Sequence, residues 1–310
     1  MNSFFAIIFL NLQISMAEID FKGLGVALAT PFKRDLSIDY KALDSLISNT
    51  IEGGCDYLVV LGTTAETPTL SYEEKLGITK YIKTSAGGRV PLILGIGGNN
   101  TSAVIEDIMS RDLDGYSAIL SVTPFYNKPS QEGLFRHFKS ICEASPLPLI
   151  LYNVPSRTGV NLTAQTTIRL AEFSPKILGI KEASGNLQQA KEIIENAPEG
   201  FRVISGNDSD TFRFMQAGAA GVISVLANAF PAQVKHLVNL CVQNKFSEAE
   251  NYQNKLSSII LPLFEEGNPA GVKAVLSQMG LMENILRLPL VPVSKNVDEK
   301  LKKASAELLS

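Results

Sequence analysis

Eight short apolar runs, each followed by a stretch with the pattern of a helix, restrict the fold of this chain more than any other feature. The runs are rich in Ile, Leu and Val and are bounded by Gly, Pro or Asn. This pattern is typical of parallel strands that are covered on both faces. The runs occupy residues 25–32, 57–62, 91–98, 117–125, 148–155, 177–184, 201–208 and 221–228.

Strands that alternate with helices indicate βαβ units and a parallel sheet. Eight such units within about 230 residues predict an α/β fold of the closed (β/α)₈ TIM-barrel type. An open doubly wound sheet is the structural alternative. Helix starts are expected at Ser37 and at Ser71, and Glu74 completes a capping-box pattern with Ser71.

The 310 residues divide into three segments, and 45% hydrophobic composition is enough for a large core. No linker rich in Pro, Gly or Ser interrupts residues 20–245, so we expect a catalytic barrel over 16–245 and a C-terminal helical region over 246–310. Residues 1–15 contain "FFAIIFL", but no Lys or Arg precedes it and it is too short to span a bilayer. We interpret 1–15 as a dispensable extension, or as a mis-assigned start before Met16, rather than as a signal peptide.

Composition excludes several function classes. The net charge of -3 argues against a nucleic-acid surface, which needs a basic stripe. Cys55, Cys142 and Cys241 are odd in number and far apart, which fits a reducing cytoplasm without disulfides. His137 and His236 are too few for a histidine zinc site. We therefore expect no metal, no cofactor, no nucleic acid and no membrane among the partners.

The segment "GIGGNN" (95–100) resembles part of a dinucleotide-binding loop. It lacks the third glycine, because position 100 is Asn100, and it follows the third strand rather than the first. We interpret it as a tight turn from a strand into a helix.

Active residues of a barrel lie at the carboxyl ends of its strands and in the loops that follow. Each residue selected in this way also has an ordinary structural interpretation, such as a helix cap, a rim aromatic or a solvated charge. For the last two residues of the set below, a turn role is the favoured interpretation. The residues selected are Thr63, Thr64, Tyr126, Tyr152, Arg157, Lys181, Gly206 and Asn207.

Lys181 lies inside the apolar run "ILGIKEASG" (177–185), where a lysine is unusual. One interpretation is a lysine whose stem covers apolar surface while its ammonium group reaches water. The other is chemical, because a primary amine condenses with a ketone to give a Schiff base, which serves as an electron sink. The attacking amine must be neutral, and apolar surroundings disfavour the ammonium form. Arginine could not replace it, since a guanidinium group stays protonated.

Schiff-base chemistry also needs proton transfer and substrate binding. Glu182 should point to the opposite face of its strand, so the hydroxyls of Tyr152, Thr63 and Tyr126 are the candidates for a proton relay. Thr63, Thr64 and nearby backbone N–H groups could hold a small carboxylate. Arg157 offers a bidentate donor for a second carboxylate.

Four motifs then carry a family resemblance: "GTTAETPTL" (62–70), "TPFYNKPSQEGLFRHF" (123–138), "YNVPSRTG" (152–159) and "GIKEASGN" (179–186). From about Gly23 to the C-terminus the chain resembles the 4-hydroxy-tetrahydrodipicolinate synthases, also called dihydrodipicolinate synthases. The resemblance implies a (β/α)₈ barrel with a C-terminal helical region, in a homotetramer built from two tight dimers. It implies a lyase that joins pyruvate to L-aspartate 4-semialdehyde, on the route to diaminopimelate and lysine.

The same resemblance implies roles for the catalytic residues. Lys181 resembles the Schiff-base lysine of the family. Tyr152 resembles its general acid/base, in a relay with Thr63 and with Tyr126, which family members insert across the dimer interface.

It also implies roles in substrate binding. Thr64 resembles a residue that holds the pyruvate carboxylate, and Arg157 one that receives the semialdehyde carboxylate. Ile223 matches a position whose backbone lines the pocket, with Gly206 and Asn207 nearby after the seventh strand. The chain departs from the family at Ala65, where glycine is more usual, and a turn that needed a positive φ would resist alanine.

Two alternatives remain open. Another pyruvate-dependent class I aldolase, such as an N-acetylneuraminate lyase or a sugar-acid aldolase, would share the lysine and the tyrosine. Arg157 favours the synthase, since a short acidic aldehyde needs that cation more than a polyol does. A catalytically silent barrel that only binds a small acid would form no covalent adduct with pyruvate.

The resemblance further predicts weak inhibition by L-lysine. Sensitive relatives place acceptors for lysine in the helix after the second strand and in the turn after the third. Here those stretches hold Tyr72, Lys75, Asn99 and Ala103. Asn99 keeps an amide acceptor, but Ala103 offers no carboxylate and the charge of Lys75 would repel the ligand.

Overall fold

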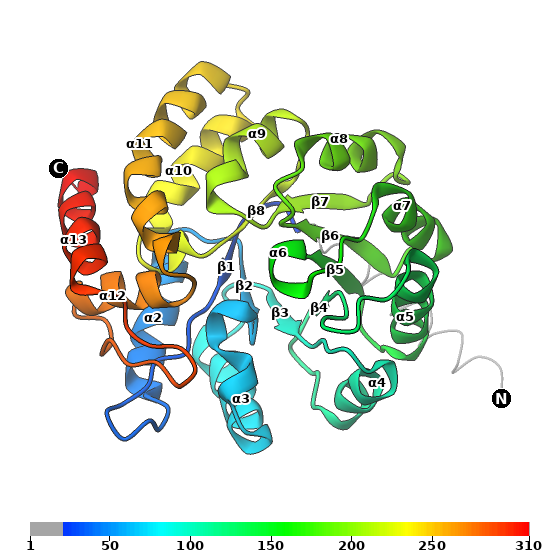
Figure 1. The fold of residues 1–310 in the computed structure, drawn as a ribbon, viewed down its shortest axis with the longest axis horizontal. Coiled ribbons are helices and arrows are strands. Elements are labelled where there is room, and N and C mark those ends of the chain that lie inside the picture. Colours follow the sequence, from blue (N-terminus) through cyan, green and yellow to red (C-terminus); the bar gives the residue numbers. More distant parts are fainter. Residues whose placement is uncertain (1–20, 310) are drawn as a thin grey trace.

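Eight parallel strands pair in chain order and close into a barrel in the computed structural model, which describes residues 21–309 (Figure 1). This confirms the TIM barrel and excludes the open sheet. The predicted extension over 1–15 and the start at Met16 lie outside the described residues. The strands are β1 (Gly23–Ala27), β2 (Tyr57–Val60), β3 (Leu92–Gly95), β4 (Ala118–Val122), β5 (Leu149–Asn153), β6 (Ile177–Glu182), β7 (Arg202–Ser205) and β8 (Gly221–Ser224).

The seam between β1 and β8 requires a glycine. Gly23 pairs with Gly221 there, and a Cβ atom built on Gly221 would lie 1.9 Å from the carbonyl oxygen of Gly23. No side chain fits in that space, so the absence of one at position 221 lets the last strand meet the first.

Helices surround the barrel, and most begin at a capping side chain. Ser71 and Glu74 form the predicted capping box. The helix expected from Ser37 begins later, at Tyr40, because Asp39 accepts hydrogen bonds from the backbone of Lys41 and Ala42. The helices are α2 (Tyr40–Glu52), α3 (Tyr72–Ala86), α4 (Thr101–Ser110), α5 (Gln131–Ala144), the short α6 (Pro155–Thr158), α7 (Ala164–Phe173), α8 (Leu187–Asn196), α9 (Thr211–Gln216) and α10 (Pro231–Val242).

Three further helices follow the barrel: α11 (Phe246–Glu265), α12 (Ala270–Gln278) and α13 (Lys295–Leu309). They pack on one another, and α11 also packs against α9 and α10 (Figure 1). Across residues 21–309, no helix has the length and apolar character needed to cross a bilayer.

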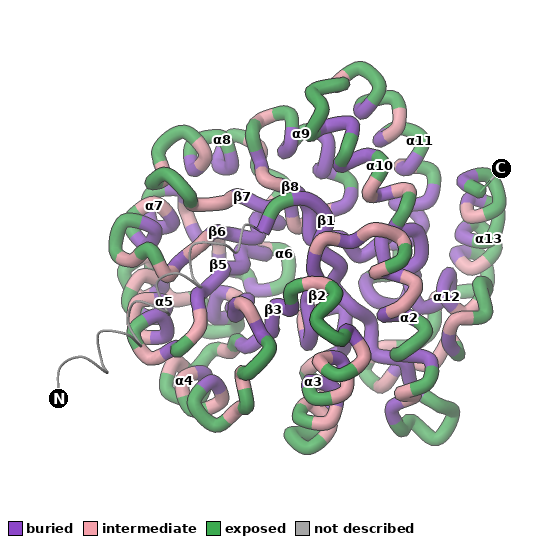
Figure 2. The backbone as a smooth tube through the Cα atoms, turned by 180° about the vertical axis from the view of Figure 1, so that it is seen from behind, coloured by how far each residue is buried: buried purple, intermediate pink, exposed green. Residues whose placement is uncertain are grey.

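The apolar core has two layers. Figure 2 shows buried strands at the centre and exposed outer faces on the helices. One layer fills the space between strands and helices. The other lies inside the barrel and includes Tyr57, Val59, Ile150, Tyr152, Ala183, Ile204 and Ile223. Tyr152 and Ile223, both selected from the sequence, therefore face the barrel interior.

Candidate active site

Lys181 is buried near the carboxyl end of β6. Its residue is only 5% exposed, so its ammonium group does not reach out to solvent over an apolar surface. In the strand register it stands between Tyr152 on β5 and Ile204 on β7. Its Nζ atom lies 4.5 Å from the centre of the Tyr152 ring. The fold thus brings a buried amine against a phenol inside the barrel.

The other hydroxyls of the predicted relay are less closely joined. Thr63 begins the 3₁₀ turn η1 (Thr63–Ala65), which follows β2. Tyr126 lies in the loop between β4 and α5, is 85% exposed and has a φ of 74°. No hydrogen bond between residues 21 and 309 links the hydroxyls of Tyr152, Thr63 and Tyr126. A single copy of the chain therefore assembles the lysine–tyrosine pair but not the relay.

Glu182 faces away from Lys181, as the strand alternation predicts. Its buried carboxylate accepts hydrogen bonds from Asn153 Nδ2 at 3.0 Å, Gln189 Nε2 at 2.9 Å and the backbone N–H of Ser184 at 2.7 Å. These bonds tie the end of β6 to β5 and α8. The Glu182 carboxylate is therefore used in structural hydrogen bonds outside the barrel interior.

Asp208 is a buried acid that the sequence analysis did not select. It follows β7 and accepts hydrogen bonds from the Ser224 hydroxyl and from the backbone N–H groups of Val225, at 3.0 Å, and Leu226, at 3.2 Å. Burial raises the pKa of Asp208, whereas these hydrogen bonds and the charge of Lys181 lower it. Asp208 is thus a buried carboxyl close enough to Lys181 for their charges to interact. The sequence signal for it was its position directly after "GN", at the end of the seventh strand.

Gly206 and Asn207 have clear structural roles in the turn after β7. The Gly206 N–H donates to the Glu182 carbonyl at 2.8 Å, and a Cβ atom at Gly206 would lie 2.6 Å from Ala183 Cβ. Asn207 Nδ2 donates to Asp210 at 2.9 Å. These contacts account for both residues, and their part in substrate binding stays a prediction.

The loop after β2 places Thr64 in a buried position, 1% exposed. Its Oγ1 atom accepts a hydrogen bond from Asn268 Nδ2 at 3.0 Å. Ala65 lies within the 3₁₀ turn, and the left-handed conformation falls on the next residue, Glu66, with a φ of 54°. The departure from glycine at position 65 is therefore sterically harmless, because position 65 is not the one that needs a positive φ.

Arg157 belongs to α6, the single turn of helix that follows β5, and is exposed. A hydrogen bond of 3.3 Å, from the Thr123 hydroxyl to the Thr158 hydroxyl, joins this helix to the end of β4. Within the described part of the chain, the Arg157 guanidinium forms no ion pair. Ile223 is fully buried in β8, in register with Gly25 of β1.

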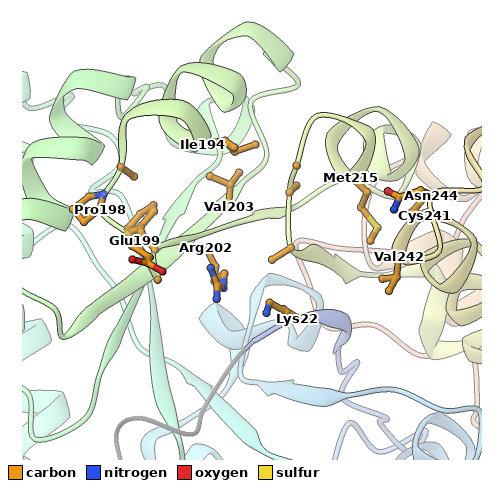
Figure 3. A pocket seen from close by; sticks show the side chains of 16 residues that line it. Lys22, Ile194, Pro198, Glu199, Arg202, Val203, Met215, Cys241, Val242 and Asn244 are labelled. Carbon is orange, nitrogen blue, oxygen red and sulfur yellow. The ribbon is translucent and has the colours of Figure 1, made fainter.

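A cavity of about 460 Å³ lies at the opposite end of the barrel (Figure 3). Lys22, Arg202 and Val203 line it, and they stand at the amino ends of β1 and β7. Barrel chemistry takes place at the carboxyl ends, so this cavity is separate from the Lys181 site. Among residues 21–309, no group of three or more His, Cys, Asp or Glu side chains could hold a metal ion.

Residues 20–308 match the sequence model of the dihydrodipicolinate synthetase family. The 4-hydroxy-tetrahydrodipicolinate synthase of Parabacteroides distasonis is 50% identical over 293 residues, which are 94% of this chain and 99% of that protein. The crystal structure of dihydrodipicolinate synthase from Thermotoga maritima superposes with a TM-score of 0.91 at 38% identity, covering 93% of this chain and 98% of that one. The chloride-inhibited enzyme of Acinetobacter baumannii, complexed with pyruvate, gives a TM-score of 0.90 at 41% identity, covering 93% and 99%.

Proposed function

The chain belongs to the dihydrodipicolinate synthetase family, and from this we propose that Lys181 forms the Schiff base through which the enzyme works. The enzyme is a lyase, a 4-hydroxy-tetrahydrodipicolinate synthase. It condenses pyruvate with L-aspartate 4-semialdehyde in the biosynthesis of diaminopimelate and lysine. The observation that supports the assignment to Lys181 is its burial against Tyr152 at the carboxyl end of β6.

The reaction begins when the neutral amine of Lys181 attacks the ketone carbon of pyruvate. Water leaves after two proton transfers, for which the Tyr152 hydroxyl is the nearest acid/base. Loss of a methyl proton converts the imine into an enamine, whose carbon attacks the aldehyde carbon of the semialdehyde. The amino group of the product then displaces Lys181, which leaves as the free amine, and closes the ring.

A hydroxyl donor and a guanidinium cation suit the two substrate carboxylates. Thr64, buried beside the barrel mouth, donates to the carboxylate of pyruvate. Arg157, exposed on α6, receives the carboxylate of the semialdehyde, since its guanidinium can donate two parallel hydrogen bonds. The backbone near Ile223, Gly206 and Asn207 lines the remainder of the site.

The test is covalent capture followed by turnover. The enzyme is incubated with pyruvate, reduced with borohydride, digested and mapped by mass spectrometry. A label on Lys181, with turnover of pyruvate plus aspartate semialdehyde, supports the proposal. Turnover only with pyruvate plus N-acetylmannosamine would identify the other aldolase, and the absence of any label would identify a silent binding barrel.

We also propose that the active unit is a homotetramer of two tight dimers in which Tyr126 completes the relay of a neighbouring subunit. In one copy this tyrosine is 85% exposed and holds a left-handed backbone conformation, with a φ of 74°. The positive φ is uncommon for a residue other than glycine. A strained backbone that holds the ring out from the single chain supports its insertion into a neighbouring subunit.

Mixed dimers test the shared site. Tyr126→Phe, which removes one hydroxyl, is expected to lower kcat by about 10²-fold. Subunits carrying Tyr126→Phe, refolded together with subunits carrying Lys181→Met, should recover about a quarter of wild-type activity, because half of the dimers then contain one intact site. Recovery of no activity in confirmed mixed dimers would show that each site is built from one chain.

We further propose where in the cell the enzyme works and which part of the chain carries the chemistry. We place the reaction in the cytoplasm, where the free and buried thiols of Cys55, Cys142 and Cys241 would stay reduced. We assign the chemistry to the barrel over 16–245. The helical region over 246–310 then contributes helices α11–α13 and contacts with the barrel.

L-lysine is expected to inhibit weakly. Tyr72 of α3 is 45% exposed and lies 5.8 Å from the guanidinium of Arg111, which is paired with Asp107 at 2.8 Å. Tyr72 thus offers a lysine ligand no carboxylate, and Lys75 is the cation nearby in sequence that forms no ion pair within residues 21–309. Asn99 Nδ2 is engaged with the Phe125 carbonyl at 3.3 Å. Initial rates at subsaturating pyruvate, measured over a lysine titration, should fall only slightly at submillimolar lysine. Strong cooperative inhibition in that range would contradict the prediction.

A further inference from the structure

Two polar side chains from the C-terminal helical region reach the loop that carries Thr64. Asn268, just before α12, donates to Thr64 Oγ1 at 3.0 Å across a sequence separation of 204 residues. Lys273, within α12, donates from Nζ to the carboxylate of Glu66 across 207 residues. The side chains of Lys273 and Glu66 are both 0% exposed. A buried ion pair thus joins α12 to the loop over 63–66.

Glu66 needs these partners. Its backbone is left-handed, with φ 54° and ψ 34°, which is costly for a residue other than glycine. Besides Lys273, its carboxylate accepts a hydrogen bond from the backbone N–H of Arg287 at 3.1 Å. Both donors come from the C-terminal helical region. The carboxylate of Glu66 is therefore held by residues that lie far along the chain, while the backbone of the loop turns through local hydrogen bonds such as that from the Glu66 N–H to the Thr63 carbonyl.

The hydrogen bond from Asn268 uses Thr64 Oγ1 as an acceptor. A threonine hydroxyl has one hydrogen and two lone pairs. Since the Asn268 amide donates to the oxygen, the hydroxyl hydrogen stays available to an acceptor. A carboxylate is an acceptor only, so this arrangement suits Thr64 to hold the pyruvate carboxylate.

We propose that Asn268 and Lys273 are positioning residues for pyruvate: they hold Thr64 as a donor and Glu66 in its left-handed conformation, and so shape the 63–66 loop. This inference rests on the proposed role of that loop in binding pyruvate. Neither residue touches the reacting atoms. Their removal should therefore affect pyruvate binding and imine formation before it affects the second substrate, which Arg157 receives.

The burial of the ion pair determines how the variants should be designed. Burial lowers the pKa of Lys273 to about 8, and the charge of Glu66 opposes that shift. Replacing Lys273 alone leaves the carboxylate buried without its cation, which is strongly destabilising. Replacing both partners by neutral groups of similar size leaves no buried charge. The double variant therefore separates loss of positioning from loss of folding.

The experiment compares three variants with the wild type. They are the single variant Lys273→Met, the double variant that combines Glu66→Gln and Lys273→Met, and the single variant Asn268→Ala. Lys83→Met, which breaks a surface ion pair with Asp114, is the matched control. For each protein we measure thermal unfolding, KM for both substrates, and the rate of borohydride-trapped adduct formation with pyruvate. We expect KM for pyruvate to rise, and trapping to slow, by about tenfold or more in the three variants. KM for the semialdehyde should stay within about twofold, and the control should match the wild type.

The outcomes separate the two proposals. A wild type that forms no adduct with pyruvate overturns the proposed function and this inference together. A wild type that forms the adduct, with folded Asn268→Ala and double variants whose KM for pyruvate is unchanged, overturns only the positioning role. If Lys273→Met does not fold, Asn268→Ala and the double variant test the positioning role on their own. Equal losses for both substrates would indicate a purely structural role.

Discussion

Lys181→Met is expected to lower kcat by at least about 10³-fold and to abolish the borohydride-trapped adduct with pyruvate. Methionine keeps the length and the apolar stem of the side chain but has no amine, so no Schiff base can form. Position 181 is buried among apolar side chains. The nearby Asp208 keeps its hydrogen bonds from Ser224, Val225 and Leu226, so the substitution should leave the barrel folded. Steady-state rates and mass spectrometry of the reduced protein measure both effects.

Lys191→Met provides the matched control, because Lys191 is an exposed lysine of α8. It should keep full activity and the full adduct yield. Thermal unfolding of both variants, followed by circular dichroism, establishes that the fold is intact. A Lys181→Met enzyme that retains the adduct, or more than about a tenth of wild-type kcat, would contradict the assignment of the nucleophile.

Arg157→Ala is expected to reduce condensation by about 30- to 1000-fold, equivalent to about 2–4 kcal/mol of lost charge-assisted binding. Imine formation with pyruvate alone should stay close to the wild-type rate, because the substitution leaves Lys181 and the loop over 63–66 unchanged. The guanidinium is exposed and forms no ion pair within residues 21–309, so its loss should not destabilise the fold. Single-turnover trapping and steady-state condensation separate the two steps.

Two further variants sharpen the test at α6. Arg157→Lys should recover only part of the activity, since an ammonium group keeps the charge but not the bidentate geometry. Arg169→Ala removes another exposed arginine, which pairs with Glu132 on the outer face of the barrel, and should leave both steps unchanged. If Arg157→Ala slowed imine formation as much as condensation, Arg157 would be structural.

Much of the fold was predictable because each strand is buried on both faces. Such strands appear as continuous apolar runs, and seven of the eight strands fall within the predicted segments. The exception is β1, which begins two residues before its predicted segment. The predicted start of α2 was wrong by three residues, because Asp39, and not Ser37, is the residue that caps the helix. The seam at Gly23 and Gly221 was not predictable, since it depends on a contact between the two ends of the barrel.

The contact between Lys181 and Tyr152 was predictable, because both residues lie at the carboxyl ends of neighbouring strands. A contact was not predictable where the partner comes from the C-terminal region. Lys273 lies in "AGVKAVL", where the same criterion that selected Lys181, a lysine in apolar surroundings, also applies. The sequence gives no indication that its partner is Glu66, because the two are joined only by the folded chain.

The ion pair between Glu66 and Lys273 has a consequence for how the protein is made. A ribosome adds about 5–20 residues per second, so about 10–40 s separate the synthesis of two residues that are 207 positions apart. Once residue 224 has been added, late in that interval, the nascent chain contains Lys181 and all eight strands, but Glu66 still has no cation. The loop over 63–66 therefore gains its buried cation only after α12 has been made, and a chain terminated between residues 224 and 273 has all eight strands without this ion pair.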